Sequence, residues 1–168
     1  MLKRIFISLS KVQFISIYKT LIRPKLDYLA SICSPSNEKD QDVLDKIQRK
    51  AIKLVRGFKN HDYHVRCRLL GITSLKTRRT RGDLIEIYKL FNNLYDLDVS
   101  LFFKTRSEVL TRKSIALRGH NYYISKPLSR SNNHRNSFLC RPIDIWNELL
   151  HDIVNALTLN SFKSKIAN

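Results

Sequence analysis

The chain is poor in the residues that mark many functional classes. Its 168 residues include four glycines, four prolines, three cysteines and only 14 Asp and Glu. Four glycines are too few for a Gly-rich phosphate cradle, and neither a Gly-x-x-x-x-Gly-Lys nor a His-Glu-x-x-His motif occurs. The odd number of widely spaced cysteines implies no disulfide framework and favours a reducing compartment. No run approaches the roughly 18 consecutive apolar residues of a membrane span, so we expect no membrane partner.

Groups that could perform catalysis or hold a metal are also scarce. Cys67 follows His64 closely, but no second Cys or His pair completes four zinc ligands. Asp40 and Asp42 are explained by the electrostatics of a helix start, and the five histidines have no serine-and-carboxylate neighbourhood in the sequence. The sequence therefore predicts no catalytic residue, no metal site and no cofactor within this chain.

What the chain does contain is positive charge. It has 31 Lys and Arg, a net charge of +17 and a sequence pI near 10.1, values that point to nucleic acid or an anionic membrane surface as partner. Residues 46–81 hold twelve Lys or Arg against one acid, Asp62. A segment of one sign repels itself, and a polyanion would neutralise it. A merely solvated surface is the alternative, although solubility alone is usually served by mixed charges.

Helical spacing of apolar residues dominates the first hundred positions. Residues 11–32 are expected to form two helical pieces broken at Pro24. A short helix from about Asp62 to Leu70 should stop at Gly71. A longer one, capped by Ser74, should run to about Asn93. Its predicted apolar stripe consists of Leu84, Ile87, Tyr88, Phe91, Leu94 and Tyr95. Gly82 within it is interpreted as a point where another backbone approaches.

The clearest predicted element is an amphipathic helix with a cap at Ser36 or Asn37 that ends near Val55, before Gly57. At 100° per residue, its predicted core face holds Leu44, Ile47, Ala51 and Val55. The opposite arc holds Lys46, Arg49, Lys50, Lys53 and Arg56. No Glu follows Asp45 to form i,i+4 pairs with these cations. We therefore predict that this arc, with Arg78, Arg79 and Arg81 as a second cluster, binds phosphate groups.

The pattern weakens after residue 103. Residues 104–130 are expected to form loops with a small hairpin. A helix from about Asn136 to Leu150, kinked or restarted at Pro142, should carry Phe138, Ile145, Trp146 and Leu149. A last helix, Ser161 to Ile166, is expected to be capped by Asn160 or Ser161. The predicted fold is mainly α, with a helical region over residues 1–100 and a C-terminal extension over 101–168.

Several motifs, in order along the chain, resemble a known family. They are Ile17-Tyr18-Lys19-Thr20-Leu21-Ile22-Arg23-Pro24-Lys25-Leu26-Asp27-Tyr28, Ser34-Pro35, Leu44-Asp45-Lys46-Ile47-Gln48-Arg49-Lys50-Ala51, Leu70-Gly71-Ile72-Thr73-Ser74-Leu75, Arg78-Arg79-Thr80-Arg81-Gly82-Asp83-Leu84, Phe102-Phe103, Arg118-Gly119-His120 and Arg141-Pro142-Ile143-Asp144-Ile145-Trp146-Asn147. Together they resemble the segment after the polymerase palm in reverse transcriptases of non-LTR retrotransposons of the LINE type, with the Jockey and CR1 branches nearest. The likeness covers nearly the whole chain from Lys11 onward. Cys33, where the family usually has Trp, is one departure.

This resemblance implies a polymerase thumb-like helical bundle followed by the post-thumb extension. It implies a partner as well, the backbone of an RNA or RNA–DNA duplex, which thumb helices grip behind the active site. The Ala-Asp-Asp acids of the palm are absent, so the chain should not polymerise by itself. Magnesium would be expected only in the missing palm.

Two alternatives remain open. The chain could be a standalone basic adaptor whose apolar faces bind a protein partner. Residues 1–25 hold six cations and no acid, and so resemble a mitochondrial presequence. The competing interpretation is an ordinary first helix. We expect a nuclear or cytoplasmic location in preference to a mitochondrial one.

Overall fold

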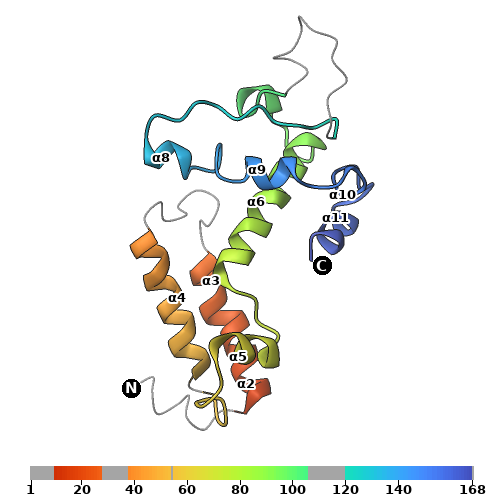
Figure 1. Ribbon diagram of the computed structural model, residues 1–168. Helices are drawn as coiled ribbons and strands as arrows, with labels where there is room; N and C mark the ends of the chain where they lie inside the picture. The colour runs from red at the N-terminus through yellow and green to blue at the C-terminus, as the bar shows by residue number, and fades with distance from the viewer. Residues whose placement is uncertain (1–9, 28–37, 54, 106–119, 168) are drawn as a thin grey trace, which may run out of the picture. The chain divides into compact units, whose positions relative to one another are not determined.

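The computed structural model describes residues 10–27, 38–53, 55–105 and 120–167 (Figure 1). Within these ranges the regular secondary structure is helical and no strand is formed. A single antiparallel bridge pairs Thr105 with Ile124. The mainly α prediction is thus confirmed. Residues 106–119, where the expected hairpin would turn, lie outside the described residues. The described helices include none that is long and apolar enough to cross a bilayer.

The chain divides into two compact units, Met1–Arg79 and Thr80–Asn168. We expected a division near residue 100. The difference arises within helix α6 (Leu75–Phe91), because its apolar stripe from Leu84 onward packs with C-terminal residues in one hydrophobic core. The first unit has a separate core, to which the helices before Gly71 contribute.

The first unit begins with one helical stretch that passes through Pro24. It consists of α2 (Lys11–Ile17), the π-helical η1 (Tyr18–Ile22) and α3 (Arg23–Asp27). The predicted break at Pro24 is wrong. The backbone N–H of Arg23 donates to the carbonyl of Tyr18, five residues back, so the helix is widened immediately before the proline. This wider turn accommodates a ring that would otherwise clash with the carbonyl four residues earlier.

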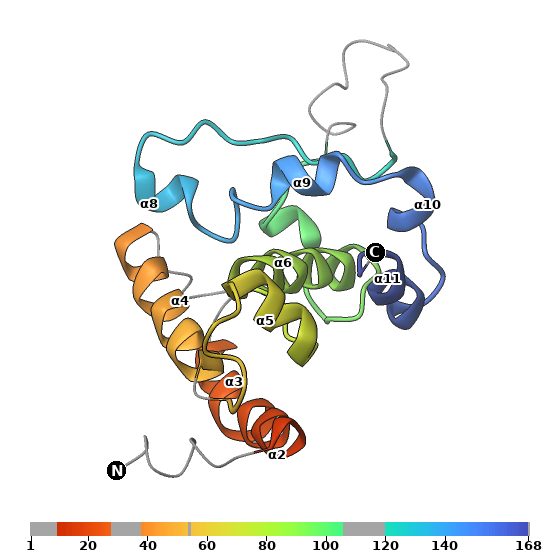
Figure 2. The same cartoon turned by 60° about the horizontal axis from the view of Figure 1, so that its bottom comes forward.

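Two further helices complete the first unit, α4 (Glu38–Lys53) and α5 (Tyr63–Leu70). In both ribbon views α4 lies alongside the stretch formed by α2, η1 and α3 (Figures 1 and 2). The Asp62 side chain caps α5 by accepting from the N–H of His64, and Gly71 ends it with φ +62°. These ends of α5 are as predicted. The expected cap of α4 at Ser36 or Asn37 lies outside the described residues.

The buried face of α4 differs from the predicted one. The helix ends at Lys53, before the expected end near Val55. Gln48 and Ile52 are fully buried, whereas Ile47 is 44% exposed, so its expected core position is wrong. Gln48 and Ile52 follow Leu44 by four and eight positions, so at 100° per residue they lie about 40° and 80° from Leu44 around the helix axis. The buried side of α4 is therefore turned by about 40–80° from Leu44. The helix therefore brings a polar amide into the core, together with Phe14 and Tyr18 of the first stretch.

The second unit continues α6 and adds short elements. These are the 3-10 turn η2 (Val99–Leu101), α8 (Asn132–Arg135), α9 (Ile143–Asn147), α10 (His151–Val154) and α11 (Leu159–Lys165). The single helix expected from Asn136 to Leu150 is thus wrong, although Pro142 does restart the chain as the N-cap of α9. The last helix begins earlier than expected, because Thr158 caps it by accepting from the N–H of Ser161.

The core of the second unit surrounds Trp146, which is fully buried. Its ring stacks with Phe91 at 5.8 Å between centroids, and its indole N–H donates to the carbonyl of Tyr122 at 2.8 Å. Tyr88 of α6 stacks on Phe162 of α11 at 4.3 Å. This packing accounts for the predicted stripe as far as Phe91, where α6 ends.

Three expectations about this unit need correction. Leu94 and Tyr95 follow the end of α6 and are exposed, because the helical periodicity that would bury them stops at Phe91. Ile145 is 41% exposed, since the core position of α9 belongs to Ile143 instead. No atom of the described residues lies within 4 Å of where a Cβ on Gly82 would stand, so they do not supply the expected close approach of another backbone.

Candidate nucleic-acid interface

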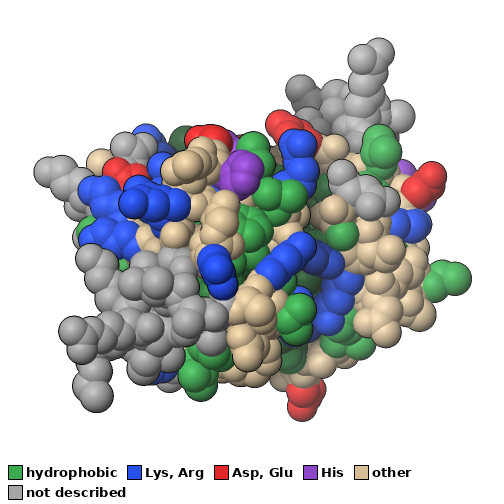
Figure 3. Space-filling model, turned by 90° about the horizontal axis from the view of Figure 1, so that it is seen from below, with side chains coloured by type: hydrophobic (Ala, Val, Ile, Leu, Met, Phe, Trp, Pro, Cys, Tyr) green, Lys and Arg blue, Asp and Glu red, His purple; other side chains and the backbone are tan. Residues whose placement is uncertain are grey.

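The predicted cationic arc of α4 lies at the surface. Four of its side chains lie on α4 and the fifth, Arg56, lies just after the helix; all five, which we call the α4 cations, are exposed: Lys46, Arg49, Lys50, Lys53 and Arg56. Among the described side chains none of them forms an ion pair. Lys and Arg side chains also cover more of the surface drawn in Figure 3 than Asp and Glu side chains do. The α4 cations therefore present their charge to solvent, as the amphipathic pattern predicted.

Arg49 is an α4 cation that contacts a residue of the first core. Its guanidinium lies over the ring of Tyr63, 4.6 Å from the ring centroid, so the side chain packs on α5 while its charge stays exposed. The three lysines have no such contact. Charge can thus be changed at the lysines with less disturbance of packing than at Arg49.

Behind these cations lies a buried polar network, here called the Gln48 network. Tyr18 Oη donates to Gln48 Oε1 at 2.9 Å, and Gln48 Nε2 donates to Tyr63 Oη at 3.1 Å and to the carbonyl of Thr73 at 3.2 Å. One amide therefore joins η1, α4, α5 and the loop before α6. Burial makes each of these bonds valuable, because an unmade one would leave a polar atom without solvent.

The three arginines of the second predicted cluster do not form one exposed group. At 100° per residue, Arg79 lies 100° from Arg78 on α6, whereas Arg78 and Arg81 lie only about 60° apart. Arg79 is only 9% exposed, and Arg81 of the second unit donates to the carbonyl of Lys163 at 2.7 Å. The three side chains are therefore not the joint surface cluster that was predicted, and Arg78 lines a pocket.

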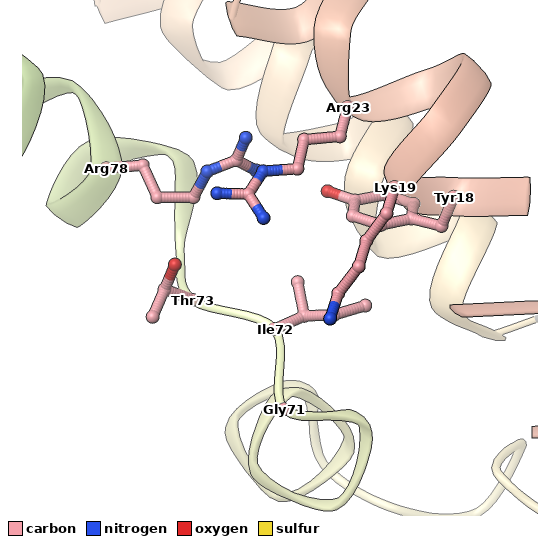
Figure 4. Close-up of a pocket in the computed structure, with 7 residues that line it drawn as sticks. All are labelled: Tyr18, Lys19, Arg23, Gly71, Ile72, Thr73 and Arg78. Atoms are coloured by element: carbon pink, nitrogen blue, oxygen red, sulfur yellow. The ribbon is translucent and has the colours of Figure 1, made fainter. Parts of the chain in front are cut away.

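That pocket lies within the first unit and is cationic. Its lining residues are Tyr18, Lys19, Arg23, Gly71, Ile72, Thr73 and Arg78. Arg23 of α3 and Arg78 of α6 extend toward one another, with their guanidinium groups close together above Thr73 (Figure 4). None of the seven residues is acidic. We call it the Arg23–Arg78 pocket.

The electrostatics of the pocket follow from burial and from like charge. Burial lowers the pKa of Arg78, and the neighbouring positive charge of Arg23 lowers it further, while a hydrogen bond to Tyr18 opposes both effects. For Tyr18, burial raises the phenol pKa and Arg78 opposes that rise. Each change of pKa is in the direction expected for a partly buried group, and the like charge of Arg23 adds to the effect on Arg78.

The metal-binding residue types are not grouped in the part of the chain that the structure describes. No group of three or more His, Cys, Asp and Glu side chains lies close enough there to hold a metal ion. Cys67 and Cys140 are buried free thiols, and burial raises the pKa of Cys67. Cys33 lies outside the described residues.

Comparison with known proteins gives no relative: no family model, no curated protein and no solved structure matches the chain.

Sequence reasoning missed Lys19 and Arg23 as site residues. One signal was present, because they are four positions apart on a helix and therefore share a face. Their approach to Arg78 joins positions 55 residues apart in the sequence, and no local pattern contains it. The buried Gln48 was also missed, since an amide between Ile47 and Arg49 has no distinctive spacing.

Proposed function

We propose that this chain grips the sugar-phosphate backbone of an RNA or RNA–DNA duplex through the α4 cations. The observation that carries the proposal is the exposure of all five cations without an ion pair among the described side chains. Lys and Arg side chains only donate hydrogen bonds, and phosphate contacts carry no base information. Binding should therefore depend on charge and not on nucleotide sequence.

The length of the cationic arc suits a duplex. From Lys46 to Lys53 the α4 axis rises about 10 Å at 1.5 Å per residue. B-form DNA carries one negative charge per about 1.7 Å of axis, so about six phosphate charges lie along that length. Several cations can thus meet different phosphates at the same time, and each meeting releases condensed counterions.

We propose further that the chain is the thumb and post-thumb region of a reverse transcriptase from a non-LTR retrotransposon. The support is the ordered series of motifs from Tyr18 to Trp146, combined with the mainly α architecture. The chain has none of the palm carboxylates that two-metal phosphoryl transfer requires. It would hold a template-primer duplex for a catalytic palm and would not synthesise DNA alone.

The test measures heteroduplex affinity after reversing charge at α4. In the variant Lys46→Glu/Lys50→Glu/Lys53→Glu, the affinity for a 20-base-pair RNA–DNA duplex at 50 mM salt should fall by more than about a hundredfold. The control Lys11→Glu/Lys59→Glu/Lys104→Glu changes the same charge at exposed positions outside α4. Helicity of both variants is checked by circular dichroism. Equal losses in the two variants would reduce the effect to net charge and overturn the proposed site.

A protein-binding adaptor is the second candidate, and one feature of the second unit favours it. Its segment after α6 exposes several large apolar side chains: Leu94, Leu97, Leu101 and Phe102. Exposed apolar residues gathered in one segment are common at protein interfaces. This candidate gains support if the wild-type chain fails to bind the heteroduplex and the segment proves necessary for capture of one purified protein.

A further inference from the structure

One α4 cation is held in place by a second helix. The Arg49 guanidinium lies over the ring of Tyr63, 4.6 Å from the ring centroid, and Tyr63 is the first residue of α5. Both residues belong to the first unit. Among the described side chains, Lys50 and Lys53 are exposed and have no such contact, and a lysine that projects into solvent samples many rotamers. Arg49 thus has a position that the fold sets.

The contact with Tyr63 leaves the N–H donors of Arg49 available. An aromatic ring attracts a cation without accepting a conventional N–H···O hydrogen bond. Asp45 precedes Arg49 by four positions, a spacing at which opposite charges often pair on a helix. In the described part of the chain the two form no ion pair, and Asp45 Oδ1 is buried without a hydrogen-bond partner. Arg49 is exposed, so an anion can reach its donors from solvent.

The Tyr63 ring is itself fixed in the core of the first unit. It is 9% exposed, and its hydroxyl accepts a hydrogen bond from Gln48 Nε2 at 3.1 Å. Burial raises the pKa of the Tyr63 phenol, and the charge of Arg49 opposes that rise only in part. Tyr63 is therefore neutral at pH 7, and Arg49 rests on an aromatic ring that is in place before any ligand binds.

We propose that Tyr63 positions Arg49 as the anchor of the phosphate grip, where Arg49 makes a two-pronged contact with one backbone phosphate and the α4 lysines act as point charges. The inference rests on the proposed function and gives different roles to cations that it treats alike. A planar guanidinium matches two phosphate oxygens at once, whereas an ammonium is a compact charge. A side chain that is already held also loses less conformational entropy on binding.

The first experiment examines the free chain. With ¹⁵N-labelled arginine, the Nε–H resonance of Arg49, assigned by its absence in Arg49→Lys, should be displaced by the ring current of Tyr63. The displacement should persist in Tyr63→Phe, which keeps the ring, and vanish in Tyr63→Leu. The Nε–H order parameter of Arg49 should exceed that of Arg56, which is exposed and has no ring contact among the described residues. An undisplaced resonance with equal order parameters would overturn the positioning role.

The second experiment measures affinity for the 20-base-pair RNA–DNA duplex at 50 mM salt. Arg49→Lys keeps the charge but should lower the affinity about fivefold to tenfold, because an ammonium lacks the paired donors. The matched control Arg56→Lys makes the same exchange at a cation without a ring contact and should lower the affinity only about twofold.

The role of Tyr63 is read from the same duplex affinity. Tyr63→Leu should lower it about threefold, since Arg49 must then be ordered on binding, and Tyr63→Phe should restore it. In the Arg49→Lys background, Tyr63→Leu should have little further effect, because Tyr63 acts through Arg49. An equally large effect in both backgrounds would overturn the proposal, since Tyr63 would then act only by supporting the fold.

The remaining outcomes separate the anchor from the proposed function. If Tyr63→Leu does not fold, as judged by circular dichroism, the comparison of Arg49→Lys with Arg56→Lys decides the question, and equal losses would overturn the anchor. If Lys46→Glu/Lys50→Glu/Lys53→Glu loses affinity while Arg49→Lys does not, the proposed function stands and the anchor fails. If the wild-type chain does not bind the duplex, the proposed function fails and the anchor fails with it.

Discussion

The ion pair between Asp83 and Arg141 offers a quantitative test of how the second unit is held together. Arg141 Nε donates to Asp83 Oδ2 and Arg141 Nη2 donates to Asp83 Oδ1, both at 2.7 Å, and Nη1 donates to the carbonyl of Asn136 at 3.1 Å. The Asp83 side chain is 4% exposed and that of Arg141 18%. Removal of one partner therefore leaves a charge that solvent hardly reaches.

The expected magnitude follows from that burial. Asp83→Ala should destabilise the second unit by about 3–5 kcal/mol, since a charge that loses its partner in a dry site is costly. Arg141→Met should cost a similar amount. The double variant should cost far less than the sum, because neither charge then remains buried alone.

The assay is urea unfolding followed by fluorescence. Trp146 is the only tryptophan in the chain and is fully buried in this unit, so its emission reports the unit directly. With a urea dependence of about 1 kcal/mol per molar for a unit of this size, Asp83→Ala should lower the midpoint by roughly 3 M or leave the unit unfolded. A loss below about 1 kcal/mol, or strictly additive single effects, would refute the assigned role of the pair.

Three other predictions concern the first unit and the buried thiols. Gln48→Leu should destabilise the first unit by about 2–4 kcal/mol in thermal unfolding followed by circular dichroism, because three polar partners lose their hydrogen bonds; an unchanged Tm would contradict the Gln48 network. Backbone N–H donors at the start of α5 lower the pKa of Asp62, so the stability that its carboxylate adds is present above the usual pKa of 3.8 and is lost as pH falls through the lower folded pKa. In Asp62→Asn the free energy of unfolding should therefore fall less steeply below about pH 4 than in the wild-type chain. Parallel plots of this free energy against pH for the two proteins would argue against the cap. In a Cys33→Ser variant, Cys67 and Cys140 should react with a thiol reagent only when the chain is unfolded in denaturant, whereas rapid labelling of the native chain would show that they are accessible.

Some of the fold could be predicted from local signals. Helix α5 is bounded by Asp62 and Gly71, whose capping and left-handed conformations depend on neighbouring residues only. The cations of α4 also lie where the 100° periodicity places them. In such cases the information lies within a few residues of the element, so the sequence alone is sufficient.

Other features depend on contacts between distant positions. Gln48 is buried because Tyr18, Tyr63 and the loop at Thr73 supply its partners, and none of these contacts can be derived from the α4 sequence. The continuous helix through Pro24 depends on a π turn, which has no simple sequence signal.

The candidate site shows the same division. The α4 cations were recognised from periodicity, whereas the Arg23–Arg78 pocket requires the folded first unit. Arg79 and Arg81 were assigned to phosphate because they follow Arg78 in the chain. Arg79 lies 100° from Arg78 on the helix and is 9% exposed, and Arg81 donates to the carbonyl of Lys163, so the fold uses these two side chains elsewhere.

The central claim, that the α4 cations meet phosphate directly, is tested most directly by the salt dependence of heteroduplex binding. With five phosphate contacts, the plot of log association constant against log salt concentration should have a slope of about −4 to −5. In the variant Lys46→Glu/Lys50→Glu/Lys53→Glu the slope should become shallower by about 2 to 3. A slope that is the same in both proteins, or that is near zero in the wild-type chain, would contradict the account.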